Sequence, residues 1–110
     1  MTSDSWLMAY GTFPNEESAK KVITFLLESK LIACGNILGP GTSLYFWEGK
    51  LQEDKEVYVL MKTKASLFGA LLQAFRQQHP YQVPCLLSWT MTETSPEYEN
   101  FLRESLRREE

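Results

Sequence analysis

The 110-residue sequence has few cysteines, little excess charge and no long apolar run, and each shortage excludes a class of protein. The two cysteines, Cys34 and Cys85, form neither a CxxC pair nor a disulfide framework, so reduced thiols are expected, as is usual in the cytosol. The net charge of -3 argues against a nucleic-acid-binding protein, which normally carries a basic face. The N-terminal residues include an acid where a signal peptide has bases, and no stretch is apolar for long enough to span a membrane. A cytoplasmic chain without membrane contact is therefore predicted, with residues 1–5 as a disordered tail.

Recognisable catalytic motifs are missing as well. His79 is the single histidine, so a Ser-His-Asp or Cys-His-Asn triad could be built only around it. Neither cysteine stands in a known nucleophile motif, and no glycine-rich phosphate or dinucleotide loop occurs. The sequence therefore predicts a self-assembling binding or regulatory protein rather than an enzyme.

What the sequence does contain is a series of periodic apolar segments that fit one small α+β domain over residues 1–110. Strands are expected at residues 6–13, 33–38, 42–47, 57–62 and 83–91. The Gly-Pro-Gly triplet at 39–41 interrupts the second strand, and the polar segment 48–55 predicts a hairpin turn. Helices are expected to begin after Asn15, Ser66 and Ser95, whose side chains can cap a first turn. The first helix should end near Lys30, and the second at 77–81, before Pro80.

The resulting order, strand-helix-strand-strand-helix-strand, is the split βαβ or ferredoxin-like arrangement, here with a long hairpin and an additional C-terminal helix. Two helices can cover only one face of such a sheet. The strands nevertheless carry apolar residues at both parities, as where Tyr58 and Leu60 alternate with Val57 and Val59. The uncovered face and the edges of the long hairpin both predict association with further copies of the chain.

Several motifs resemble those of the CutA family, the divalent-cation-tolerance proteins. In chain order they are Ala33-Cys34-Gly35-Asn36-Ile37, Ser43-Leu44-Tyr45-Phe46-Trp47-Glu48-Gly49-Lys50, Lys62-Thr63, and His79-Pro80-Tyr81-Gln82-Val83-Pro84, followed by the aromatic residues Tyr98 and Phe101. The resemblance extends from about Met8 to Leu102. It implies a ferredoxin-like homotrimer in which long hairpins extend neighbouring sheets, a likeness to PII-type signalling proteins, and a link to copper and other divalent cations.

The resemblance also implies metal ligands, and the sequence departs from the family at most of these positions. Family members place copper ligands on a first-strand cysteine, on histidine near the H-P-Y turn and on an acid after its second proline. Here those positions fall at Gly11, at Gln78 with His79, and at Cys85. His79 and Cys85 remain candidates because imidazole and thiolate bind copper and zinc well, although a tight site needs about three or four ligands, which neighbouring subunits could complete. The alternatives are hydrogen bonding to the end of its own helix for His79, and burial as small hydrophobes for Cys85 and Cys34.

Five further residues are predicted to line a cleft between subunits: Tyr45, Trp47, Glu56, Lys62 and Tyr81. Lys62 and stacked aromatic rings could hold a small polar ligand there. Packing within a trimer is the alternative, because aromatic residues are enriched at interface cores. Two functions therefore stay open. One is a trimeric protein that binds Cu(II) or another divalent cation in metal tolerance, with no required cofactor. The other is a trimeric PII-like signalling or scaffold module that binds a small molecule or an unidentified partner protein, without a physiological metal site.

Overall fold

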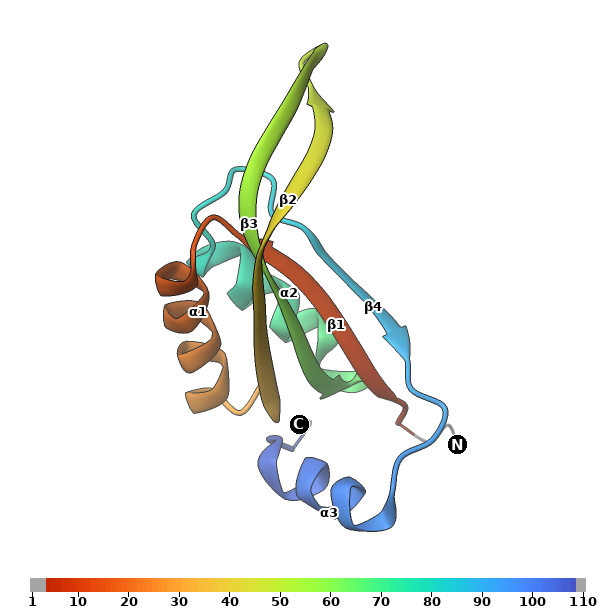
Figure 1. Cartoon of the computed structure of the whole chain (residues 1–110). Coiled ribbons are helices and arrows are strands. Elements are labelled where there is room, and N and C mark those ends of the chain that lie inside the picture. Colours follow the sequence, from red (N-terminus) through yellow and green to blue (C-terminus); the bar gives the residue numbers. More distant parts are fainter. Residues whose placement is uncertain (1–3, 109–110) are drawn as a thin grey trace.

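The computed structural model describes residues 4–108, which form a four-stranded antiparallel sheet and three α-helices (Figure 1). The elements are β1 (Trp6–Phe13), α1 (Glu16–Glu28), β2 (Cys34–Trp47), β3 (Lys50–Lys64), α2 (Phe68–Gln78), β4 (Leu86–Thr90) and α3 (Pro96–Ser105), with a 3₁₀ turn at Ala65–Leu67 before α2. The strand order in the sheet is β2-β3-β1-β4, and each neighbouring pair is antiparallel. The predicted order of elements is thus confirmed. No helix within residues 4–108 is both long enough and apolar enough to cross a membrane.

Capping side chains fix two of the three helix starts as predicted. Asn15 accepts a hydrogen bond from the Ser18 backbone N–H at 2.8 Å, and Ser95 accepts one from the Tyr98 N–H at 3.3 Å. The predicted cap by Ser66 is wrong: α2 begins after Leu67 without a side-chain cap, and the Ser66 hydroxyl and backbone N–H both donate to the carboxylate of Asp4. Of the predicted N-terminal tail, residues 1–3 lie outside the described residues, whereas Asp4 is held against the start of the second helical segment.

The hairpin formed by β2 and β3 is more regular than the sequence suggested. The glycine-proline-glycine triplet does not end the strand, since β2 continues past it with a register shift between Leu38 and Gly41. The predicted turn over 48–55 is also wrong: only Glu48 and Gly49 form the turn, with φ of 52° and 80°. Residues 50–55 can be mostly polar because they pair with the end of β2 in an exposed two-stranded ribbon, whose backbone ladder needs no apolar side chains. This ribbon projects beyond the rest of the sheet (Figure 1).

The fourth strand is shorter than predicted. Its pairing with β1 ends where Leu86 meets Gly11, so residues 83–85 form a loop instead of continuing the strand. Pro84 lies in this segment and has no N–H to donate to a ladder. The loop and the end of α2 consequently lie beside the base of the hairpin.

The two faces of the sheet are covered unequally. Ala9, Phe13, Val59 and Met61 point toward α1 and α2, and each is fully buried with the core residues of those helices. The main core therefore lies between the sheet and these two helices.

Residues of the opposite parity remain open to solvent on the other face. Leu38, Leu87 and Trp89 lie there with exposed fractions of 47%, 48% and 48%. The predicted apolar character of both faces is confirmed.

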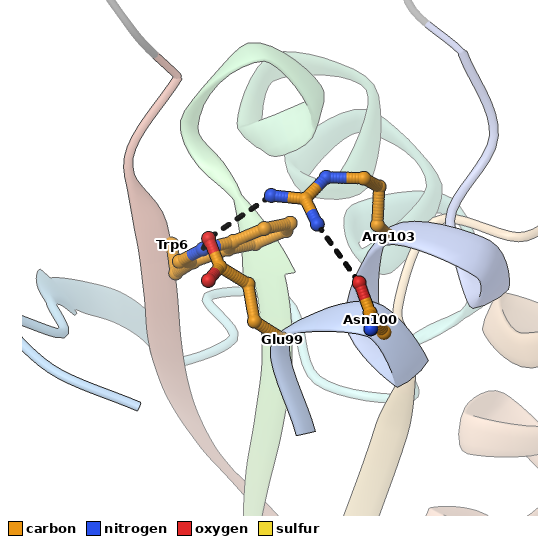
Figure 2. Close-up of polar contacts among 4 residues, drawn as sticks. All are labelled: Trp6, Glu99, Asn100 and Arg103. Atoms are coloured by element: carbon orange, nitrogen blue, oxygen red, sulfur yellow. Dashed lines mark hydrogen bonds and ion pairs between the residues drawn. The ribbon is translucent and has the colours of Figure 1, made fainter. Parts of the chain in front are cut away.

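Helix α3 covers only the end of this second face that lies away from the hairpin tip. The indole N–H of Trp6 donates to Glu99 Oε2 at 3.0 Å, and Arg103 pairs with the same carboxylate at 3.0 Å (Figure 2). The Arg103 guanidinium lies 5.6 Å from the Trp6 ring centroid and donates to Asn100 Oδ1 at 3.4 Å. These contacts attach α3 to the start of β1 and leave the centre of the face uncovered.

Candidate functional site

A cavity of about 510 Å³ extends along the hairpin, from Trp47 near its turn to Glu56, beside the loop between α2 and β4. Its lining combines four aromatic side chains, two carboxylates and one thiol: Tyr10 from β1, Tyr45 and Trp47 from β2, Asp54 and Glu56 from β3, and Tyr81 and Cys85 from the loop. Asp54 and Glu56 share a face because side chains alternate along a strand. This cavity, the Glu56 pocket, brings together four of the five residues predicted for the cleft.

Glu56 is the most buried charged group of the pocket, with an exposed fraction of 8%. Its Oε1 accepts a hydrogen bond from the Ser43 hydroxyl at 2.6 Å, and its Oε2 accepts one from the Tyr81 hydroxyl at 2.6 Å. Both donors are neutral. The ion pairs within residues 4–108 are Lys20–Glu16 and Arg103–Glu99, so Glu56 has no cationic partner in this part of the chain.

The tyrosine hydroxyls and the cysteine thiol around the pocket have raised pKa values and stay neutral. Burial raises the pKa of Tyr81, and its hydrogen bond to Glu56 raises it further. The hydrogen bond from the Tyr45 hydroxyl to Asp54 raises the pKa of Tyr45. Burial, followed by the charge of Glu56, raises the pKa of the Cys85 thiol. The pocket therefore disfavours any additional negative charge.

His79 lies behind the pocket as a buried residue at the end of α2, with an exposed fraction of 7%. Its Nε2 is 2.7 Å from the Thr12 carbonyl oxygen, and its Nδ1 accepts the Tyr81 backbone N–H at 3.1 Å. The ring is thus neutral with its proton on Nε2, and it stacks on Phe13 at a centroid distance of 4.3 Å. Burial lowers its pKa, partly offset by the Thr12 carbonyl and by Glu56.

This geometry changes the interpretation of His79. The expected hydrogen bond from its side chain to its own helix end is wrong, since the acceptor is Thr12 in β1. Both ring nitrogens are engaged within the chain, so neither presents a free lone pair to a metal ion.

The other family ligand positions are equally constrained. At Gly11 an added Cβ would lie 2.9 Å from Phe75 Cζ and 3.0 Å from the Cys85 carbonyl oxygen, so the first-strand position is closed by the core. Cys85 lines the Glu56 pocket with a thiol that burial keeps protonated. Across residues 4–108, no group of three or more His, Cys, Asp or Glu side chains is placed to hold a metal ion.

Lys62 belongs to a separate cluster within one chain. Its Nζ donates to Asn36 Oδ1 at 2.7 Å and to Cys34 Sγ at 3.7 Å, and it lies 6.0 Å from the Tyr98 ring centroid. The sequence analysis missed Tyr10, Ser43 and Asp54 as pocket residues. Side-chain alternation could have identified Asp54. If the third strand had been predicted to begin at Lys50, residues 54 and 56 would have fallen on one face.

Comparisons with known proteins agree with this architecture. The chain matches the family model of the CutA1 divalent ion tolerance protein over residues 7–105. It is 38% identical over 102 residues to the divalent-cation tolerance protein CutA of Pyrococcus horikoshii, covering 93% of this chain and 99% of the relative. It is 42% identical over 96 residues to the protein of that name from Citrobacter koseri, covering 87% and 84%.

Solved structures are similar over the same span. CutA1 from Oryza sativa has a TM-score of 0.91 at 34% identity, with 94% of each chain covered. The divalent cation tolerance protein from Thermus thermophilus has a TM-score of 0.89 at 35% identity, covering 93% of this chain and 99% of its own. The chain therefore belongs to the CutA1 divalent ion tolerance protein family.

Proposed function

We propose that this protein is a homotrimeric binding protein of the divalent-cation response, and that each copy holds a small ligand in the Glu56 pocket. The observation that carries the proposal is a ligand-sized cavity with a buried carboxylate that has no cationic partner among residues 4–108. Family membership supplies the connection to divalent cations. Of the two functions left open by the sequence, the geometry favours the PII-like one, in which a ligand or partner conveys the response.

The open sheet face supports assembly. Leu38, Leu87 and Trp89 lie with Tyr58 on the face that α1 and α2 do not cover. Contiguous exposed apolar surface of this kind marks interaction sites. A trimer, the assembly that the family resemblance implies, would remove this surface from water and would also bring the exposed hairpins against neighbouring copies.

Binding rather than catalysis suits the chemistry of the pocket. A nucleophilic cysteine needs a lowered pKa, whereas burial and Glu56 raise that of Cys85. His79 would be the natural general base, but both of its nitrogens are used in the fold. The pocket residues thus form a recognition surface without a matched nucleophile and base, and we assign no required cofactor.

A resident copper site is the function that this geometry supports less. At the family's ligand positions the sequence offers two candidates, His79 and Cys85, and a tight site takes about three or four ligands. His79 would have to break a buried hydrogen bond to bind, and Cys85 would have to lose its proton beside Glu56.

Calorimetric titration of the purified chain with Cu(II) and Zn(II) tests this proposal, with the mass measured in parallel by light scattering. We expect a trimeric mass, no stoichiometric high-affinity binding of either metal, and no change with Cys85→Ser. Stoichiometric binding that is abolished by both His79→Ala and Cys85→Ser would contradict the proposal and establish a metal site. Circular dichroism of each variant separates lost binding from lost folding.

A further inference from the structure

We propose that the Glu56 pocket binds a small organic cation: an amine whose ammonium group is held by the pocket carboxylates and whose apolar body lies among the aromatic side chains. The inference rests on the proposed function, because it names the ligand class of that same pocket. It is carried by the charge, the side-chain chemistry and the size of the cavity.

The charged groups that line the pocket are both acids. Asp54 and Glu56 contribute carboxylates, and no lysine, arginine or histidine is among the lining residues. Glu56 is nine-tenths buried, and its two hydrogen-bond partners, Ser43 and Tyr81, bring no positive charge. A buried charge is unfavourable unless an opposite charge joins it, so a bound cation would supply the partner that residues 4–108 lack.

The pKa values of four neighbouring tyrosine and cysteine side chains are all raised. Burial raises the pKa values of Tyr10, Tyr81 and Cys85, the Asp54 hydrogen bond raises that of Tyr45, and the charge of Glu56 adds to all four upward shifts. Burial disfavours a charge of either sign, but the Glu56 contribution to these shifts opposes negative charge and attracts a cation. A phosphate or carboxylate ligand would meet repulsion at the same position.

The aromatic residues supply the second half of the recognition. Tyr10, Tyr45, Trp47 and Tyr81 converge on the pocket from three segments of the chain. Aromatic faces attract ammonium groups, and they pack against hydrocarbon equally well. The volume of about 510 Å³ falls within the range of about 300–1,000 Å³ that holds small molecules. An amine with an apolar body satisfies both kinds of surface at once.

A metal ion fits the same pocket poorly. Calcium and magnesium take about six or more oxygen ligands, whereas the Glu56 oxygens each accept an internal hydrogen bond and Asp54 accepts one from Tyr45. Copper and zinc favour nitrogen and thiolate ligands, and Cys85 is held protonated. By contrast, an ammonium group can be held by the negative charge of the carboxylates and by the faces of the aromatic rings.

The test compares benzylamine, which is cationic at neutral pH, with benzyl alcohol, its uncharged isostere. Each is titrated into the full chain at constant ionic strength, and tryptophan fluorescence is followed because Trp47 lines the pocket. We expect saturable binding of benzylamine and an affinity at least tenfold lower for the alcohol. Glu56→Gln should weaken benzylamine binding at least tenfold. Glu53→Gln, the same change on the same strand outside the pocket lining, should leave it within twofold.

Equal affinity for the two compounds, or an affinity that Glu56→Gln leaves unchanged, would overturn the inference. Stoichiometric displacement of benzylamine by Zn(II) would overturn it too, in favour of a metal site. If Glu56→Gln does not fold, Tyr45→Leu takes its place, with an expected loss of several-fold. If the protein is trimeric but binds neither metal nor benzylamine, the ligand inference is wrong and the proposed assembly stands. If it is monomeric and binds benzylamine, only the proposed assembly is wrong.

Discussion

At the scale of single residues, burial decides what each candidate side chain can do. His79 and Glu56 are both titratable and both nearly inaccessible, yet one faces the core and the other a cavity. The sequence named His79 through the H-P-Y motif and Glu56 as one of the predicted cleft residues. It could not supply their partners, because Thr12 lies 67 positions from His79 and Tyr81 lies 25 positions from Glu56. Those distances along the chain are bridged only by the fold.

The buried imidazole of His79 should make stability depend on pH. Its pKa is lowered in the folded chain, so the unfolded chain binds the proton more readily. The contribution of neutral His79 is complete above the ordinary histidine pKa of 6.5 and is lost as the pH falls through the lower folded value. Urea unfolding between pH 8 and about 5 should therefore show a decline in the free energy of unfolding below about 6.5.

A His79→Gln variant isolates this effect. It should be less stable than the wild type at pH 8 by about 1–3 kcal/mol, since buried hydrogen bonds are lost. The decline below pH 6.5 should shrink, because glutamine does not titrate. The same slope in both proteins would assign the pH dependence to other groups.

At the scale of elements, the sequence was most informative where local chemistry decides the structure. Asn15 and Ser95 capped α1 and α3 as predicted, and β1 has the predicted bounds. The prediction failed for β3, because its first residues are polar and exposed and lack the apolar alternation that signals a strand. That failure also concealed Asp54, and hence part of the Glu56 pocket.

The two-residue turn of the hairpin offers a prediction at this scale. Glu48 and Gly49 both have positive φ, as a type I′ turn requires, and a β-branched residue is disfavoured there. Gly49→Val should lower the free energy of unfolding by about 1–2 kcal/mol. Amide exchange should accelerate along residues 44–54 and stay unchanged in α1.

Gly69→Ala is the matched control for this change. Gly69 lies in α2 with no atom within 4 Å of an added Cβ, so alanine should raise the free energy of unfolding by up to about 1 kcal/mol. If Gly49→Val exchanged no faster than the wild type along the hairpin, the assigned turn would be incorrect.

At the scale of the whole molecule, the chain is elongated and its hairpin is exposed. The longest dimension is 47 Å against 25 Å and 24 Å for the others, since the hairpin projects away from the core (Figure 1). A chain of this length buries a limited share of its surface, and the hairpin adds exposed backbone edges. The alternation of residues in the predicted strands had indicated that both faces of the sheet would be apolar. It could not show which part α3 covers, because that depends on the contacts of Trp6 with Glu99 and Arg103.

Assembly through the open face can be tested by placing a charge on it, at Trp89 in the edge strand β4. For the proposed trimer, Trp89→Glu should convert a particle of three 12.7 kDa chains into single chains, measured by light scattering at low micromolar concentration. Phe25→Glu introduces the same charge at another exposed aromatic residue, on α1 with an exposed fraction of 40%, and should leave the mass unchanged. The melting temperature of the wild type and of Phe25→Glu should rise with protein concentration, because association stabilises the folded state, and that of Trp89→Glu should not. A wild-type chain that stays monomeric and melts at a concentration-independent temperature would show that water, and not a second copy, covers this face.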